Sequence, residues 1–143
     1  MMKKDLSPIL EGKNVLITGG GGTVGAEIAL QVTKWKPNRI VCLGRRKSNL
    51  NDVTVNTQKI DSDIDVEIEL CDICDRARIE EVFSKHRPDV IFHMAAEKDI
   101  RLTNADPVRA VMVNVHGTRN VVDAASDFTF LSLLFSSSST VEK

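Results

Sequence analysis

A run of glycines near the start of the chain has the composition and spacing of a phosphate-binding loop. The segment reads TGGGGTVG, and Gly19, Gly22 and Gly25 give the spacing G-x-x-G-x-x-G. Glycines permit a tight turn and let a diphosphate approach the backbone, while a helix start behind them supplies unpaired N–H groups. A flexible loop without a ligand is the alternative, but this segment lies between a predicted strand and a predicted amphipathic helix. We therefore expect a dinucleotide pyrophosphate to be held by Gly19, Gly21, Gly22, Thr23, Val24 and Gly25.

The second predicted strand ends in basic residues, which bears on the choice of dinucleotide. In dinucleotide-binding folds an acidic residue at this place holds the ribose 2′-hydroxyl of NAD. Here the strand RIVCL is followed by Gly44, Arg45, Arg46 and Lys47. Arginines bind a 2′-phosphate through charge-assisted hydrogen bonds, whereas a carboxylate would repel it. We therefore predict that Arg45 and Arg46 favour NADP over NAD, with a solvated basic turn as the alternative.

Cys71 and Cys74 have the spacing of a redox pair or of half a zinc site. No second pair of such ligands occurs in the chain, and the histidines at positions 86, 93 and 116 are scattered. We therefore favour two small residues at a strand end and predict no metal site. The content of three cysteines fits a reducing compartment.

Short apolar runs alternate with helical patterns, and these elements must position the residues above. Strands are expected at residues 14–18, 39–43, 64–70, 89–93 and 128–135. Helices are expected from the glycine loop to Pro37, as a short helix with loops within 47–59, from Asp75 to Pro88, and from Asp106 to Ser126. This alternation indicates an α/β fold, a Rossmann-type doubly wound parallel sheet of about five strands with helices on both faces.

Helix-capping residues and the spacing of apolar residues indicate where these elements begin and which faces they bury. Asp75 and Asp106 can accept hydrogen bonds as N-caps, and Pro107 suits a first helical position. Segment 64–70 alternates apolar and acidic residues, which suits a strand near a sheet edge. The expected apolar stripes are Val24, Ile28, Val32 and Trp35 on the first helix, and Val111, Val115, Thr118, Val122 and Ala125 on the last.

Bulk composition limits the class of protein. The chain has 143 residues, is 42% hydrophobic and has a net charge of −1, so we expect one domain over 1–143, with an N-terminal extension at 1–12 and a polar tail at 136–143. Acidic and basic residues are mixed, without the basic stripe of a nucleic-acid-binding protein. No apolar run reaches the roughly 18 residues of a membrane span, and the first residues lack the apolar segment of a signal peptide. We therefore expect a cytoplasmic protein.

Three longer segments resemble the extended short-chain dehydrogenase/reductase superfamily, and within it the CapD-type polysaccharide biosynthesis proteins, which are UDP-N-acetylglucosamine 4,6-dehydratases. They are GKNVLITGGGGTVGAEI, CDICDRARIEEVFSKHRPDVIFHMAAEKDI and NADPVRAVMVNVHGTRNVVDAA, and they extend from about Gly12 to Ala125. The resemblance implies the NADP-binding portion of a nucleotide-sugar 4,6-dehydratase or epimerase in surface polysaccharide biosynthesis. Asn114 matches the asparagine that ties the sheet to the long helix.

The resemblance also implies roles for residues at the strand ends. Asp72 and Ile73 match a pair that contacts the adenine ring of the cofactor. Ala95 and Ala96 match small residues that let the cofactor lie close to the sheet. Lys98 matches a lysine near the substrate side, which makes it a candidate catalytic residue, with a solvated loop lysine as the alternative.

Part of the superfamily's catalytic machinery has no counterpart in this sequence. In the superfamily, a Ser or Thr after the fifth strand and a Tyr-x-x-x-Lys on the next helix carry the chemistry. The run at 136–140 makes Ser138 the candidate hydroxyl, with a frayed polar tail as the alternative, and the chain contains no tyrosine. We therefore expect a chain truncated before the sixth strand and the substrate region, able to bind cofactor without turnover. A subunit of a split enzyme and a stand-alone NAD(P)-binding module are the alternatives.

The last predicted strand has a further expected consequence. Without a following strand and helix, the apolar residues of 128–135 would lack cover, so we expect an exposed patch that self-associates. The sequence leaves open which sugar nucleotide is used, the stereochemistry at C5 and the oligomeric state.

Overall fold

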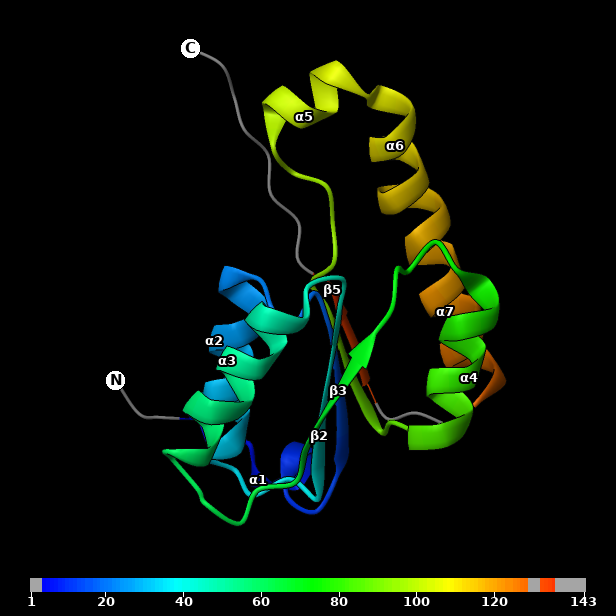
Figure 1. Cartoon of the computed structure of the whole chain (residues 1–143). Coiled ribbons are helices and arrows are strands. Elements are labelled where there is room, and N and C mark those ends of the chain that lie inside the picture. The colour runs from blue at the N-terminus through cyan, green and yellow to red at the C-terminus, as the bar shows by residue number, and fades with distance from the viewer. Residues whose placement is uncertain (1–3, 129–131, 136–143) are drawn as a thin grey trace.

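A computed structural model shows five parallel strands in one sheet, in the order β3-β2-β1-β4-β5 (Figure 1). The structure describes residues 4–128 and the backbone of 132–135. This order is that of a doubly wound sheet, so the predicted fold class is confirmed. The strands are β1 (Asn14–Thr18), β2 (Arg39–Gly44), β3 (Val66–Leu70), β4 (Val90–His93) and β5 (Ser132–Phe135).

Helices cover both faces of the sheet because alternate residues of each strand point to opposite faces. Val15, Ile17 and Ile40 lie in the core shared with α2 (Thr23–Thr33) and α3 (Lys47–Gln58). Leu16 and Val41 lie in the second core, beneath α4 (Arg76–His86) and α7 (Thr118–Asp127). Figure 1 shows the sheet between these two pairs of helices. The short α1 (Ser7–Leu10) lies within the predicted N-terminal extension and buries its last residue.

A long helical segment follows β4, and its first helices project beyond the carboxyl edge of the sheet (Figure 1). It consists of α5 (Ile100–Ala105), α6 (Pro107–Val111), the π-helical turn η1 (Met112–Gly117) and α7. Asp75 and Asp106 cap α4 and α6 as predicted, accepting from the N–H groups of Arg78 and Arg109. Within the described residues, no helix is long and apolar enough to span a membrane.

The structure corrects three expectations about helices. Residues 47–58 form one continuous helix, α3, rather than a short helix with loops. The stripe predicted on the last helix is wrong at Val111 and Val115, which are exposed while Val113 and Gly117 are buried instead, and it is right at Ala125, which is buried. The π-helical turn has an i→i+5 pattern that a period of 3.6 does not anticipate. The stripe predicted for α2 is also wrong at its first residue, because Val24 is 45% exposed.

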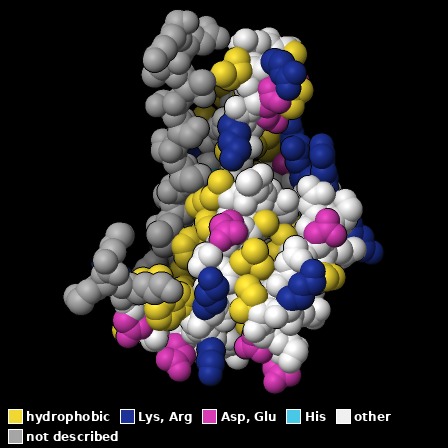
Figure 2. Space-filling model, turned by 90° about the vertical axis from the view of Figure 1, so that its left-hand side faces the viewer, with side chains coloured by type: hydrophobic (Ala, Val, Ile, Leu, Met, Phe, Trp, Pro, Cys, Tyr) yellow, Lys and Arg dark blue, Asp and Glu magenta, His cyan; other side chains and the backbone are white. Residues whose placement is uncertain are grey.

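The edge position predicted for β3 is confirmed, because β3 pairs only with β2 in the sheet. β5, at Ser132–Phe135, lies within the predicted strand range and pairs with β4, whereas Phe128 is the C-cap residue of α7. Ser138 and the polar tail lie outside the described residues, as do the side chains from 129 onward, so self-association through 128–135 stays a prediction. Figure 2 shows the face that α2 and α3 cover, where basic and acidic side chains are interspersed without a stripe of one sign.

Candidate functional site

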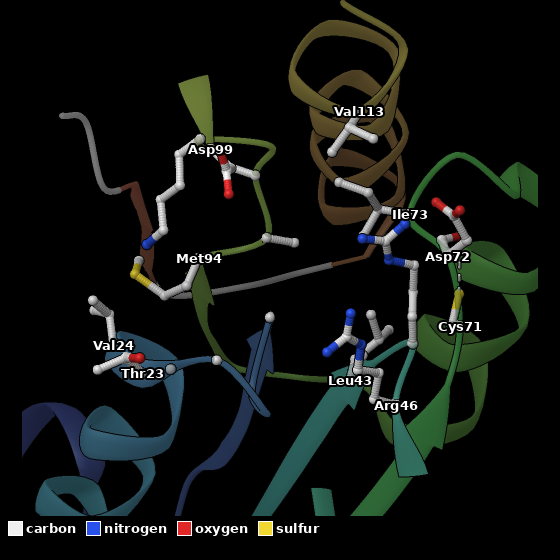
Figure 3. A pocket seen from close by; sticks show the side chains of 18 of the residues that line it. Thr23, Val24, Leu43, Arg46, Cys71, Asp72, Ile73, Met94, Asp99 and Val113 are labelled. Carbon is white, nitrogen blue, oxygen red and sulfur yellow. Dashed lines mark hydrogen bonds between the residues drawn. The ribbon is translucent and has the colours of Figure 1, made fainter. Parts of the chain in front are cut away.

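A cavity of about 610 Å³ opens at the carboxyl edge of the sheet (Figure 3). The strand order reverses between β1 and β4, and ligands of open parallel sheets bind in the crevice at such a switch point. The predicted site residues that line it are Gly19, Gly22, Thr23, Val24, Gly25, Arg45, Arg46, Asp72, Ile73, Ala95, Ala96 and Lys98. Sequence reasoning missed Leu43, Gly44, Met94, Asp99, Arg109 and Val113, which line it as well.

The glycine loop packs so closely against the strand ends that side chains are excluded at two positions. Gly19 has a φ of +67°, and a Cβ there would lie 2.7 Å from the backbone nitrogen of Ala95. A Cβ on Gly25 would clash with the carbonyl oxygen of Gly19. The Gly22 N–H donates to that same oxygen at 3.0 Å and closes the turn. Packing therefore requires glycine at positions 19 and 25, and the loop presents backbone to the cavity.

Helix α2 begins directly behind this loop, and its first turn faces the cavity. Thr23, Val24 and Gly25 are its first residues and all line the cavity. The N–H groups of a first helical turn have no partner within the helix, and the helix dipole makes this end positive. Val24 lies beside the cavity (Figure 3), which explains why it is exposed. The arrangement suits a pyrophosphate group.

A buried hydrogen-bond network joins the two strands beneath the cavity. The Thr18 hydroxyl oxygen accepts from the N–H groups of Met94 and Ala95, both at 3.2 Å. That hydroxyl lies 2.7 Å from Nδ1 of His93. Because the Thr18 oxygen already accepts two hydrogen bonds, its hydroxyl donates to Nδ1 of His93. Nε2 therefore carries the imidazole proton and donates to the Thr118 hydroxyl at 2.9 Å. Burial lowers the pKa of His93 to about 4, so the imidazole is neutral near pH 7.

A side pocket of about 190 Å³ lies between the glycine loop and the end of β2. Arg45 and Arg46 line it together with Gly21, the one predicted cofactor residue that does not line the main cavity. Asn49, from the first turn of α3, also lines this pocket and was missed by sequence reasoning. The pocket thus combines two guanidinium groups, an amide and a helix start, which are groups that bind phosphate.

Asp72 follows β3 and is held by two donors. Its Oδ1 accepts from the Cys74 N–H at 2.9 Å, and its Oδ2 lies 2.6 Å from Nη2 of Arg109. Burial alone would raise the pKa of Asp72, but these hydrogen bonds outweigh it and hold that pKa below its ordinary value. The neighbouring Ile73 packs against Gly117, where a Cβ would lie 2.5 Å from Cδ1 of the isoleucine. Asp72 and Ile73 are therefore rigidly placed at the cavity edge.

The loop after β4 brings small residues and a lysine to the cavity. Ala95 and Ala96 line it, and their short side chains leave room above the sheet. Lys98 is exposed and also lines the cavity, while its catalytic role stays a prediction. Asn114 accepts from the Glu97 N–H at 2.8 Å and donates to the Glu97 carbonyl at 2.9 Å, which links this loop to η1.

Cys71 lines the cavity and Cys74 lies in the turn that follows, and both are protonated thiols. Burial raises the pKa of Cys71 to about 11, and burial followed by the nearby Asp72 also raises the pKa of Cys74. The Cys74 thiol donates to the Met112 carbonyl at 3.4 Å. A thiolate is the form that binds metals and attacks disulfides, so these environments favour the predicted structural role.

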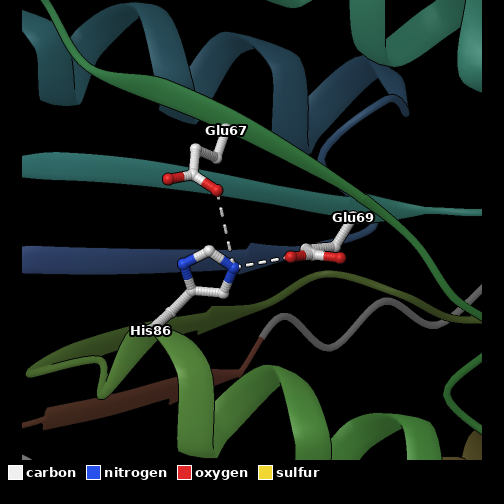
Figure 4. A group of neighbouring side chains, drawn as sticks. All are labelled: Glu67, Glu69 and His86. Atoms are coloured by element: carbon white, nitrogen blue, oxygen red, sulfur yellow. Dashed lines mark hydrogen bonds and ion pairs between the residues drawn. The ribbon is translucent and has the colours of Figure 1, made fainter.

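Within the described part of the chain, one group has side chains spaced for a metal ion: Glu67, Glu69 and His86 (Figure 4). Glu69 already accepts from Arg78 at 2.5 Å, Lys85 at 2.8 Å and His86 at 2.6 Å. Glu67 pairs with Arg39 at 3.2 Å. Arg39, Arg78 and Lys85 neutralise the carboxylates, so the group serves as a structural network between β3 and α4.

A doubly wound parallel sheet with a glycine loop at its switch point defines a Rossmann-type α/β domain with a dinucleotide-binding type of cleft. Residues 15–140 match the family model described as "Polysaccharide biosynthesis protein". The chain belongs to this family, as the resemblance implied.

Known relatives agree with this assignment. The chain is 34% identical over 122 residues to the "Probable polysaccharide biosynthesis protein EpsC" of Bacillus subtilis, covering 85% of this chain and 20% of that protein. It is 30% identical over 118 residues to a dTDP-glucose 4,6-dehydratase of Neisseria gonorrhoeae, covering 79% of this chain and 32% of that enzyme. A UDP-glucose-4-epimerase structure from Stenotrophomonas maltophila, with bound NAD and formylated UDP-arabinopyranose, superposes with a TM-score of 0.76. That match has 25% identity and covers 88% of this chain and 37% of the epimerase.

Proposed function

We propose that this chain is the NADP-binding portion of a nucleotide-sugar 4,6-dehydratase or epimerase that acts in surface polysaccharide biosynthesis. The observation that carries the proposal is the cavity at the sheet's switch point, in which glycine backbone and a helix start face the predicted adenine-binding Asp72. The chain spans a fifth to a third of the length of the curated relatives cited above, so the activity of a complete protein belongs to this proposal.

The cofactor supplies hydride chemistry, and the protein positions it. When bound, NADP would supply the reversible hydride transfer by which a 4,6-dehydratase eliminates water across C5 and C6 of the sugar. Gly19, Gly22 and the first turn of α2 would bind the pyrophosphate, and Ala95 and Ala96 leave space for the nicotinamide side of the cofactor. We assign Lys98 to the substrate side. Ser138 stays the candidate catalytic hydroxyl.

The preference for NADP rests on the side pocket. Arg45 and Arg46 line a pocket next to the glycine loop, and none of the described residues that line this pocket carries a carboxylate. Each well-formed Arg–phosphate hydrogen bond contributes about 1.5–3 kcal/mol. The free thiols of Cys42, Cys71 and Cys74 support the cytoplasmic location that we also propose.

Calorimetric titration of the chain with NADP and with NAD tests the cofactor assignment. We expect NADP to bind at least about tenfold more tightly, from one such hydrogen bond. The double substitution Arg45→Ala/Arg46→Ala should remove that difference and leave NAD binding little changed. Arg101→Ala/Arg119→Ala removes two exposed arginines that do not line either pocket and serves as the control. Tighter binding of NAD by the unmodified chain would refute the NADP preference.

Turnover is a separate question, because the chain contains no tyrosine to serve as the superfamily's acid–base residue. We expect the purified chain to bind cofactor and to leave UDP-N-acetylglucosamine unchanged. Mass spectrometry of the sugar nucleotide after incubation with the cofactor-loaded chain provides the measurement. A product lighter by one water would contradict this expectation.

A further inference from the structure

Arg109 reaches from α6 to the acidic residue that follows β3. Its Nη2 lies 2.6 Å from Oδ2 of Asp72, and its Nη1 lies 3.8 Å from Sγ of Cys74. Arg109 and Asp72 are 37 positions apart in the sequence, and both line the cavity. The ion pair is therefore part of the wall of the proposed cofactor site.

This ion pair lies next to the basic turn after β2. Gly44 and Leu70 are partners in the parallel pairing of β2 and β3, and the Cys71 N–H donates to the Gly44 carbonyl at 3.0 Å. The chain continues from these residues into Arg45 on one strand and Asp72 on the other. An uncompensated carboxylate at Asp72 would offset the positive potential of the basic turn and repel an incoming phosphate.

The charge of Asp72 is present at neutral pH and has to be compensated. The hydrogen bonds from Cys74 and Arg109 hold the pKa of Asp72 below its ordinary value, so the group is an anion under physiological conditions. Arg109 supplies the matching cation. Within the described residues, Oδ1 of Asp72 accepts from the Cys74 N–H and Oδ2 from Arg109. A carboxylate oxygen has two lone pairs, so acceptor sites remain for the amino group of an adenine ring.

The pair is held in position by the surrounding structure. The N–H of Arg109 donates to the N-cap Asp106 at 2.9 Å, which fixes the start of α6. The Asn120 amide donates to the Ile73 carbonyl at 2.9 Å, which ties the turn after β3 to α7. Arg109 and Asp72 are both about one-third exposed, so a ligand in the cavity can sense their charge.

We propose that Arg109 is a positioning residue that sets cofactor preference: by neutralising Asp72 beside Arg45 and Arg46, it lets the cleft bind a dinucleotide with a 2′-phosphate in preference to one without. This inference rests on the proposed cofactor function and adds the residue that tunes it. Arg109 acts through Asp72 and needs no contact with the ligand.

Calorimetric dissociation constants for NADP and NAD, measured at low ionic strength for the chain and three variants, test the proposal. Arg109→Met should weaken NADP binding roughly fivefold and NAD binding less than about twofold, as expected for one uncompensated charge near the phosphate. Asp72→Asn/Arg109→Met should restore the original NADP-to-NAD ratio. Arg119→Met, which removes an arginine 73% exposed on α7, should leave the ratio unchanged.

The outcomes separate this inference from the proposed function. If the unmodified chain binds neither dinucleotide, the proposed function itself fails. If it binds NADP but Arg109→Met weakens both dinucleotides equally, or the double variant does not restore the ratio, Arg109 has only a structural role and the inference is overturned. If Arg109→Met does not fold, Arg109→Lys and Asp72→Asn replace it: both should keep the NADP preference, and its loss in Arg109→Lys with Asp72 intact would refute charge compensation.

Discussion

Two carboxylates close together on β3 and the turn after it have opposite environments. Glu69 is 4% exposed, and its oxygens accept from Arg78, Lys85 and His86. Asp72 is 35% exposed, has a single cationic partner and borders the cavity. Burial of a carboxylate is tolerated only when its acceptor sites are satisfied. The comparison indicates that Glu69 stabilises the fold, whereas Asp72 keeps the capacity to bind a ligand.

The position of each carboxylate relative to β3 explains why Glu69 is buried and Asp72 borders the cavity. Glu69 lies within β3 and points to the face that α4 covers, where Lys85 and His86 approach it from the last turn of that helix. Asp72 lies beyond the end of the strand, at the carboxyl edge, where it borders the cavity. In a parallel α/β sheet, the covered face is used for stability and the carboxyl edge is used for ligands.

The largest expected effect follows from removing the buried carboxylate. Glu69→Ala should lower the free energy of unfolding by about 3 kcal/mol, because it takes away a buried acceptor shared by three donors. Since Glu69 does not line the cavity, cofactor affinity of the folded protein should stay the same. Urea denaturation and calorimetric titration measure the two quantities. A loss of affinity with unchanged stability would reverse the roles assigned to the two carboxylates.

His93, a buried titratable group on β4, extends the comparison to pH. Burial lowers its pKa from 6.5 to about 4, so below pH 6.5 the unfolded chain takes up a proton that the folded chain resists. The stabilisation that comes from keeping His93 neutral is therefore fully present above that pH. It decreases as the pH falls, by about 2 kcal/mol between pH 7 and pH 5.

Urea denaturation at several pH values measures this slope. His93→Gln, which has no titratable group, should show a flatter dependence in the same pH range, even though it lowers stability overall. An unchanged slope in that variant would assign the acid sensitivity to other groups.

The smallest expected effect on stability is that of Asp72→Ala. Its ion pair with Arg109 is partly exposed, and such pairs contribute about 0–1 kcal/mol. We expect a change in the free energy of unfolding below about 1 kcal/mol, together with weaker binding of the adenine part of the cofactor. Measuring adenosine monophosphate affinity beside urea denaturation checks both. A destabilisation as large as that of Glu69→Ala would remove the distinction between the two carboxylates.

Much of the fold and site followed from local sequence features. The strands at 14–18 and 39–43, the caps at Asp75 and Asp106, and the edge strand with alternating acids were predicted from periodicity and hydrogen-bonding chemistry within a few residues. Most predicted cofactor residues also line one cavity, because parallel strands bring their carboxyl ends to one edge.

Other features escaped prediction because distant segments create them. The spacing of Val111 and Val115 predicted that both would be buried on one face of a helix. The π-helical turn and the contact of Gly117 with Ile73 bury a different face instead. Arg109 has no feature in the sequence that distinguishes it from other helix residues. Its contact with Asp72 forms only because the fold brings α6 next to the turn after β3.

The sequence alone determined that this protein has a glycine loop between a strand and a helix, and hence a Rossmann-type cleft, because glycine spacing and apolar periodicity act locally. Only the tertiary structure decided which polar groups pair with one another: Arg109 with Asp72, Glu69 with α4, and His93 with Thr18 and Thr118. These partners are 9 to 75 positions apart. Their pairing depends on how strands and helices pack, which no local pattern encodes.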